Sequence, residues 1–225
     1  MFMKKSLLII PVIALILGGC GGNKNTEQQT DIKTDTGITY VDKVPADTKK
    51  ILLKSVIIHM KSSTFGMTQN IVMYMDDYGK KQSTEVTQKM LGKEIRQCSV
   101  SDSLYMYSFS PEDKTGKRTK IGNKGPDNIN FNAITREMAQ ELNLKKNGTA
   151  ELLGRTCEVY TMEIASAKLK GTYYIWKGIP LKTVSSVAGI SITMEATKIE
   201  ENAVIPPEKF EIPKDINFEE VASDD

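Results

Sequence analysis

The sequence predicts a mainly β (α+β) fold: a curled antiparallel sheet, or half-barrel, with one helix as a lid. From about residue 51 onward, apolar and polar residues alternate with period two in short runs that turn residues separate. Only the segment from 130 to 148 carries a helical repeat, with apolar residues every four positions. Many strands and a single helix therefore have to form one domain.

Short turns between consecutive runs predict hairpins, and hence an antiparallel meander. The most regular run has Ile190, Ile192, Met194 and Ala196 on one face and polar residues on the other. The expected strands are, in order, "SVIIHMK", "TQNIVMYMDDYGKK", "STEVTQKMLGKEIRQCSV" (two strands joined at Leu91-Gly92), "SLYMYSFSPEDK", "TCEVYTMEIA", "GTYYIW", "PLKTVSSV" and "GISITMEATKIE".

The expected helix lies in "NFNAITREMAQELNLKKNG", with Asn130 or Asn132 as its N-cap and Gly148 beyond its end. About 14 residues of helix span roughly 21 Å, whereas eight or nine strands form a sheet about 40 Å wide. One helix cannot cover such a sheet. The sheet therefore curls on itself, or apolar side chains that line part of its concave face bind a ligand.

Several expected strands are apolar on both faces, so both faces need cover. In "YYIW", Tyr173 and Ile175 lie opposite Tyr174 and Trp176, the one tryptophan of the chain. We expect Trp176 to lie in a second layer of packing.

The chain opens with "MFMKKSLLIIPVIALILGGC", which predicts a secretory signal over residues 1–19. Its apolar run is shorter than the roughly 20 residues that a membrane span needs. Leu17-Gly18-Gly19-Cys20 resembles the bacterial lipobox, and this resemblance implies lipidation (for example with palmitate) of Cys20. An ordinary signal peptide with a chance cysteine is the alternative.

Residues 20–47 are expected to form a flexible tether, because "GGNKNTEQQTDIKTDTG" is almost wholly polar. Residues 48–225 are expected to form a single domain. No acidic residue follows Cys20 before Thr26, so the pattern for inner-membrane retention is missing. This favours the bacterial cell envelope, with the lipid anchor in the outer membrane and the domain facing the periplasm.

Charge argues against a nucleic-acid partner. The formal net charge is +2 and becomes zero once Lys4 and Lys5 are removed with the signal. The basic stretch from Lys114 to Gly125 has no aromatic residues, so we predict a solvated loop there. A monomer is expected, with the membrane as its first partner.

The residues predict no enzyme. His59 is the one histidine and lies beside Ile58 and Met60 in a strand, which favours an outward-facing position. No G-x-S-x-G motif occurs, and the usual Cys and His ligands of a metal site are missing. We therefore expect no catalytic residue, no metal and no cofactor.

The nine methionines that follow the predicted signal are the most suggestive feature, since methionine is flexible and suits surfaces that adapt to varied apolar ligands. Ordinary core packing is the alternative. The hypothetical ligand site would be lined by strand residues, with helix residues as its lid. Its members are Met73, Met75, Met106, Tyr174, Trp176 and Met194 from the strands and Ile134, Met138 and Leu142 from the helix.

Cys98 and Cys157 remain once Cys20 is lipidated, and both lie in expected strands. The oxidising envelope permits a disulfide between them, but a bridge needs Cα atoms within about 7 Å. Two free, buried thiols are therefore expected, with the disulfide as the alternative.

Three segments carry a family resemblance: "GRTCEVYTMEI", "YYIWKGIPLKTV" and "AVIPPEKFEIP", which together fall within residues 150 to 213. They resemble the lipoprotein-localisation (LolA/LolB/LppX-like) superfamily, in a branch of envelope lipoproteins rather than among the carriers themselves. The resemblance implies a curled sheet that binds or carries a lipid or lipoprotein acyl chain in its concave face. The alternative is a structural or protein-interaction lipoprotein with neither ligand nor catalysis.

Overall fold

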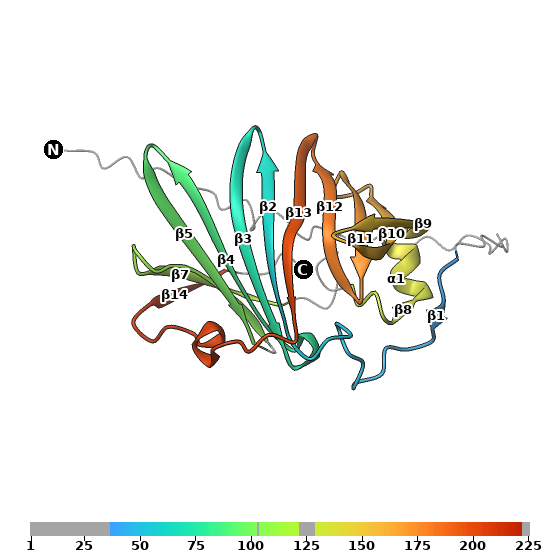
Figure 1. Cartoon of the computed structure of the whole chain (residues 1–225), viewed down its shortest axis with the longest axis horizontal. Coiled ribbons are helices and arrows are strands. Elements are labelled where there is room, and N and C mark those ends of the chain that lie inside the picture. The colour runs from blue at the N-terminus through green and yellow to red at the C-terminus, as the bar shows by residue number, and fades with distance from the viewer. Residues whose placement is uncertain (1–36, 103, 122–128, 222–225) are drawn as a thin grey trace.

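The computed structural model describes residues 37–102, 104–121 and 129–221. Twelve strands within these residues form one sheet, which curls without closing into a barrel (Figure 1) and so confirms the predicted fold class. Its strands are β2 (Val56–Thr64), β3 (Met67–Asp76), β4 (Lys81–Met90), β5 (Lys93–Ser101), β6 (Tyr105–Ser110), β7 (Thr115–Lys120), β9 (Lys145–Leu152), β10 (Arg155–Ile164), β11 (Leu169–Trp176), β12 (Ile179–Val187), β13 (Ile190–Glu201) and β14 (Asn217–Val221).

Two meanders make up this sheet. Strands β2 to β7 pair in chain order, and so do β9 to β13, each with antiparallel neighbours as predicted. Antiparallel pairing of β13 with β2 joins the two meanders. Strand β14 then adds to the outer edge of β7 in parallel. The predicted loop from Lys114 to Gly125 is wrong in part, because β7 falls within it and gains partners on both sides.

Five hairpins close with a two-residue turn in which both residues have positive φ, the geometry of a type I′ turn. The second residue is always glycine, which adopts this conformation without a steric penalty. The hairpins β2–β3, β4–β5 and β12–β13 have their turns at the same end of the strands (Figure 1). The turn residues are Phe65-Gly66, Leu91-Gly92, Leu153-Gly154, Lys177-Gly178 and Ala188-Gly189.

The helix is shorter than predicted. In the described part of the chain α1 runs only from Arg136 to Glu141, and its N-cap is Thr135, whose hydroxyl accepts a hydrogen bond from the Met138 N–H. The predicted caps have other roles: Asn130 accepts from the Asn132 N–H, and both amides donate to backbone carbonyls near residue 50. These side-chain bonds hold a turn where the periodicity suggested helix.

Ordered structure extends into the expected tether. Strand β1 (Tyr40–Val41) pairs in parallel with β8 (Ile134–Thr135), just before α1. Ile51 and Leu53 are buried in the core. The predicted signal, the predicted lipidation site Cys20 and most of the expected tether lie outside the described residues. Within the described ranges, no helix has the length and hydrophobicity to cross a bilayer.

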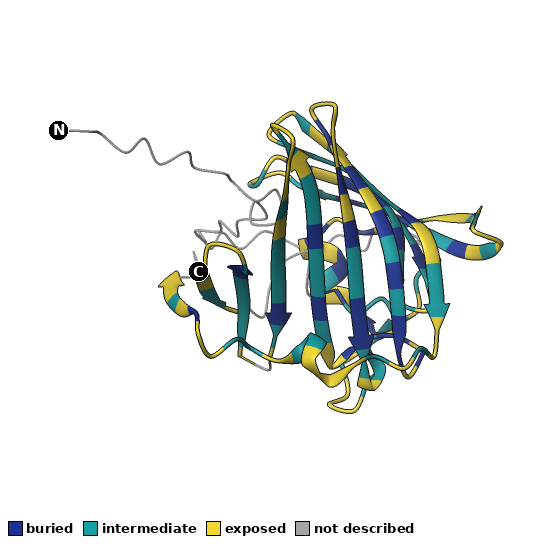
Figure 2. Ribbon diagram, turned by 60° about the vertical axis from the view of Figure 1, so that its left-hand side comes forward, coloured by how far each residue is buried: buried dark blue, intermediate teal, exposed yellow. Residues whose placement is uncertain are grey.

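Strand pairing defines two faces of the sheet, named here after neighbouring residues of β2: the Ile58 face and the His59 face. Buried and more exposed residues alternate along the strands accordingly (Figure 2). Around β2, β3, β12 and β13 the core lies on the Ile58 face, where α1 also packs, over β10 and β11. At the β5–β7 end, Val100 and Phe109 are instead buried on the His59 face, beneath Ile216 and Phe218 of the C-terminal segment. The two halves of the sheet thus bury opposite faces.

Both cysteines of the described chain are free. Cys98 lies in β5 and Cys157 in β10, and six strands separate these two in the sheet. The disulfide alternative is therefore wrong, because the meander keeps the two thiols far apart.

The Cys98 thiol predicts a pH dependence of stability. Burial, reinforced by the Glu85 carboxylate, raises the pKa of Cys98 from 9.0 to about 11. The unfolded chain therefore loses this proton at lower pH than the folded one, so the contribution to stability is complete below pH 9 and is lost as pH rises towards 11. In urea unfolding across this range, Cys98→Ser should lose less stability than the unsubstituted protein. Parallel pH profiles for the two proteins would contradict the assignment.

Candidate functional site

The two faces of the sheet differ in charge. Across β2 to β6, the residues on the Ile58 face are uncharged except Lys93, which stands at the start of β5. The histidine and the other acidic and basic side chains of these strands project from the His59 face. They are His59, Lys61, Asp76, Lys81, Glu85, Lys89, Glu94 and Arg96. An uncharged surface is suited to binding an apolar ligand, because burying an unpaired charge is costly.

Methionine follows the same division. Every methionine in a described strand projects from the Ile58 face, although these residues belong to six different strands. They are Met60, Met67, Met73, Met75, Met90, Met106, Met162 and Met194. Met138 of α1 packs over the same face at the β10–β11 end. The candidate functional site is therefore this methionine-rich, uncharged Ile58 face.

The Ile58 face is filled with core side chains at one end, the closed end, whereas at the other end Ser62, Thr64 and Gln69 are buried and Met67 is exposed. Near the start of β2, Met60 and Met75 are almost completely buried in the core cluster, together with Ile51 and Leu53. Met73 and Met194 are only partly buried against that cluster. At the end of β2, Met67 is 58% exposed. The protein's own side chains therefore fill the closed end, and the partly buried methionines lie between it and the rim.

Uncharged polar groups continue the face towards β6. Gln69 donates a hydrogen bond to Gln88 over 2.8 Å. The Thr64 hydroxyl is buried and has no hydrogen-bond partner within the described protein. An unsatisfied buried hydroxyl costs about 1–3 kcal/mol, so this part of the face can accept a polar atom of a ligand.

Four of the six strand residues predicted for the site share the Ile58 face: Met73, Met75, Met106 and Met194. Cross-strand neighbours link Met106 through Ser101 and Gln82 to Met75. Four further methionines lie on this face that were not predicted for the site: Met60, Met67, Met90 and Met162. For Met67 the signal was available, since its position in β3 differs from those of Met73 and Met75 by an even number, which places it on their face.

The structure does not place the other predicted residues on an open surface. Ile134 and Leu142 are each only 3% exposed and form core with α1 rather than a separate lid. Tyr174 pairs with Lys182 on the His59 face, so its predicted orientation differs from the structure.

Trp176 lies between two cations. The Arg155 guanidinium is 4.9 Å and the Lys177 ammonium 4.5 Å from the indole ring. Glu201 bridges these cations, at 2.9 Å from Arg155 and 3.3 Å from Lys177. The indole also packs against the core cluster. These contacts favour a structural role for Trp176 at the closed end of the face.

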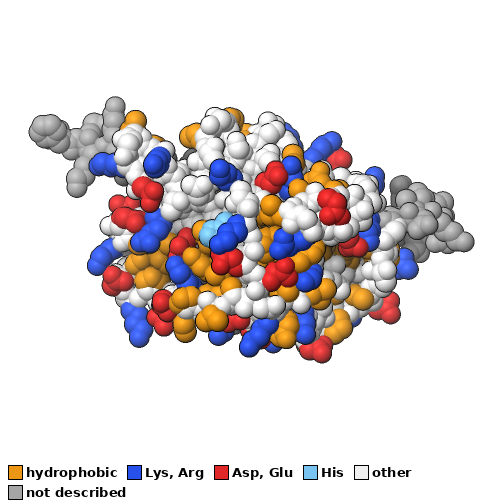
Figure 3. All heavy atoms as spheres, in the orientation of Figure 1, with side chains coloured by type: hydrophobic (Ala, Val, Ile, Leu, Met, Phe, Trp, Pro, Cys, Tyr) orange, Lys and Arg blue, Asp and Glu red, His pale blue; other side chains and the backbone are white. Residues whose placement is uncertain are grey.

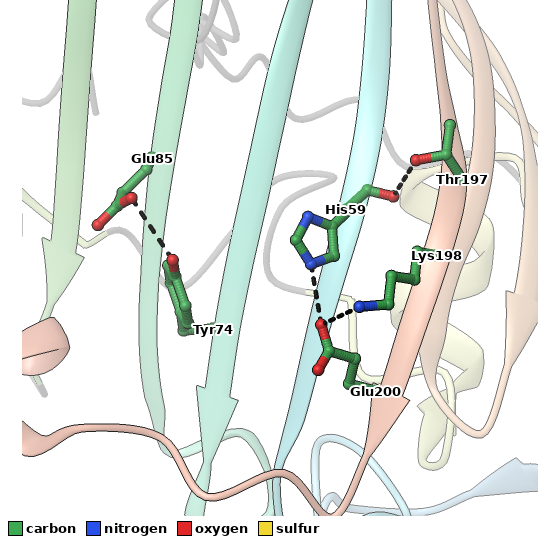
Figure 4. A network of polar contacts seen from close by, with 6 residues as sticks. All are labelled: His59, Tyr74, Glu85, Thr197, Lys198 and Glu200. Carbon is green, nitrogen blue, oxygen red and sulfur yellow. Dashed lines mark hydrogen bonds and ion pairs between the residues drawn. The ribbon is translucent and has the colours of Figure 1, made fainter.

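The His59 face carries a network of polar contacts (Figure 4). The Nε2 atom of His59 is 3.0 Å from a Glu200 carboxylate oxygen, to which Lys198 also donates at 2.9 Å. Hydrogen bonds from Lys198 and His59 hold the pKa of Glu200 below its ordinary value. The Thr197 hydroxyl donates to the His59 backbone carbonyl rather than approaching the ring. This arrangement serves as a surface ion-pair network, whose exposed pairs are screened by water and add little to stability.

Nothing in the described ranges gathers three or more His, Cys, Asp or Glu side chains in the manner of a metal site. An open hollow of about 350 Å³ lies over β9 to β13, lined mainly by residues of the His59 face. Its lining is mostly polar, and it includes none of the predicted site residues. Its walls are formed by Asn143, Lys145, Thr161, Met162, Glu163, Lys170, Gly171, Thr172, Val184, Ser185, Ser186 and Ser191.

Comparison with known proteins identifies the fold only. No protein-family profile and no curated protein sequence matches the chain. An uncharacterized conserved protein from Thermus thermophilus superposes with a TM-score of 0.52 at 9% identity, over 76% of this chain and 92% of that one. At this identity the likeness shows a shared fold alone.

Two further solved structures are less similar. The Pseudomonas aeruginosa MucA/MucB complex matches with a TM-score of 0.44 at 13% identity, over 74% of this chain and 58% of that chain. A putative outer membrane lipoprotein-sorting protein domain from Vibrio parahaemolyticus matches with a TM-score of 0.36 at 11% identity, over 69% and 88% of the two chains. Scores this low carry no functional argument.

Proposed function

We propose that this protein is a lipoprotein of the bacterial envelope that binds an apolar ligand, a lipid or an acyl chain, on its Ile58 face. One observation carries the proposal: all the methionines of the described strands project from this one face. A thioether side chain is flexible and polarizable, so a surface rich in methionine adapts to acyl chains of different length and shape.

The charge distribution supports the same ligand class. An acyl chain on the Ile58 face of β2 to β6 would leave the charged groups of those strands solvated on the other face. The unpartnered Thr64 hydroxyl and the Gln69–Gln88 pair offer hydrogen bonds to the polar end of such a ligand. The resemblance to the lipoprotein-localisation superfamily is consistent with this ligand class. No catalytic step is part of the proposal.

The same proposal includes the anchor. Lipidation of Cys20 would attach the chain to the outer membrane, with the folded domain in the periplasm. The cysteine after Leu17-Gly18-Gly19 supports this part. Mass spectrometry of the N-terminal peptide from membrane-extracted protein tests it directly.

Substitution of Met73 by lysine should weaken binding of a fluorescent fatty acid about tenfold or more, because the new charge must lose water beneath the acyl chain. Val72→Lys is the matched control: Val72 is the preceding residue of β3 but pairs with His59 on the opposite face. Its affinity should stay within about twofold of the unsubstituted protein, since its ammonium stays in water. The readout is a fluorescence titration, with native mass spectrometry of gently purified protein to detect a co-purified lipid.

Equal losses in the two variants would contradict the Ile58 face as the site. Bare protein that binds no fatty acid would reject the ligand itself. The alternative, a structural or protein-interaction lipoprotein, would then stand, and the filled closed end of the face at Met60 and Met75 favours it.

A further inference from the structure

Three neighbouring hairpins end in exposed apolar side chains. In the sheet, β5, β4, β3, β2, β13 and β12 follow one another, so the hairpins β4–β5, β2–β3 and β12–β13 are adjacent. Phe65 is 72%, Met67 58% and Leu91 95% exposed at the first two of these turns. The third turn carries Ala188, which is also exposed. Hydrophobic side chains are visible at this end of the sheet in Figure 3.

These residues are unfavourable choices for their turns. A type I′ turn prefers asparagine, aspartate or glycine at the first position, where φ is positive. Phe65 and Leu91 occupy that position with φ of 51°. Their conformation costs energy, and their side chains gain little burial in return. A contact outside the folded chain would explain both features.

The charge distribution favours these tips as the end that enters a bilayer, because few charges would have to be buried with them. Residues 62–69 and 185–192, which include two of the turns, contain no charged residue. Residues 88–94 contain Lys89 and Lys93 against Glu94. The opposite end also has exposed apolar residues, Leu104 and Leu153. There, however, charged residues of both signs accompany them, namely Asp76, Asp77, Asp102 and Glu201 together with Lys80, Lys81, Arg155 and Lys177.

We propose that the tips of these three hairpins insert into the surface of a phospholipid bilayer that contains anionic lipid. The apolar side chains project from separate turns rather than lining a groove, which suits a soft, laterally fluid partner. Phe65 and Leu91 enter the interfacial region, while Lys89 and Lys93 lie at headgroup level. Interfacial binding of this kind combines buried apolar area with attraction to anionic lipids.

Membrane docking also gives the Ile58 face an orientation. Met67 and Met90 are the methionines of that face closest to the tips. Docked tips therefore turn the Met67 and Met90 end of the methionine-rich face towards the bilayer. The docking itself does not depend on whether that face holds a ligand.

The test compares asparagine substitutions at equivalent turn positions. The variant F65N/L91N places asparagine where the turn prefers it, so the thermal midpoint should not fall. Leu153→Asn is the matched control, because Leu153 starts the same type of turn, with φ of 51°, at the opposite end. Full-length chains are mixed with phosphatidylethanolamine/phosphatidylglycerol vesicles and sedimented. F65N/L91N should bind about tenfold more weakly than the unsubstituted chain, and Leu153→Asn should bind equally well. Any anchor or signal segment contributes equally to all three proteins.

The depth to which a turn residue inserts into the bilayer provides a second readout, which does not depend on the amount of protein bound. Leu91→Trp should be quenched by brominated lipid in these vesicles, whereas Leu153→Trp should add no quenching beyond that of Trp176. Unchanged sedimentation of F65N/L91N together with unquenched Leu91→Trp would overturn the proposal and point to a protein partner. Fatty-acid binding in solution needs no vesicle, so the ligand proposal and the docking proposal can fail separately.

Discussion

Replacement of Gly178 by alanine should destabilise the protein by about 3 kcal/mol, as the sum of backbone strain and overpacking. Gly178 has a φ of +82° in the β11–β12 turn, and an added Cβ would overlap the Lys50 carbonyl oxygen and the Asn132 amide. These groups form the attachment of the segment before β2. The Leu52 N–H donates to the Lys177 carbonyl at 3.0 Å, and the Asn132 amide donates to the Lys50 carbonyl at 3.0 Å.

The variant Gly189→Ala separates the cost of backbone strain from the cost of steric overlap by the added Cβ. Gly189 has a φ of +86° in the equivalent turn of β12–β13, but a Cβ there would have no neighbour within 4 Å. This variant should lose only about 1 kcal/mol, the strain of the left-handed conformation. Urea unfolding of the two variants measures the difference. If both lose the same amount, the attachment at Gly178 adds nothing to stability.

Truncation of Leu181 to alanine should lower the free energy of unfolding by about 3 kcal/mol, within the range of about 2–5 for buried leucines. Leu181 lies in β12 at 0% exposure, within the core cluster that contains Ile58, Met60 and Cys157. Removing its side chain leaves a cavity at the junction of the two meanders, where the backbone of β12 and β13 limits collapse.

Val184→Ala in the same strand is the control. Val184 is 40% exposed on the His59 face, so its truncation should cost less than about 1 kcal/mol. Both values come from chemical denaturation at one pH. A small loss for Leu181→Ala would mean that the junction repacks around the missing side chain, contrary to the close packing inferred here.

Local sequence patterns determined the strands, the hairpins and part of the site. Alternation with period two marks β2 to β6 and β10 to β13, and it also shows that Met73 and Met75 share one face of β3. Leu91-Gly92 marked its turn because glycine follows at a position that needs positive φ. Information of this kind is local, so neighbouring residues alone suffice to determine it.

Long-range pairing decided the rest. Met106 and Met194 share a face with Met75 only because successive registers carry the alternation across strands, and a slip of one residue would reverse it. The junction of β13 with β2 and the parallel addition of β14 to β7 join segments distant in sequence. Ile134 lies in strand β8, where it pairs with Tyr40, so the helix is shorter than predicted. The sequence therefore determined which residues alternate, whereas only the tertiary structure decided which face is buried in each half of the sheet, because burial depends on what the curl and the C-terminal segment bring against that face.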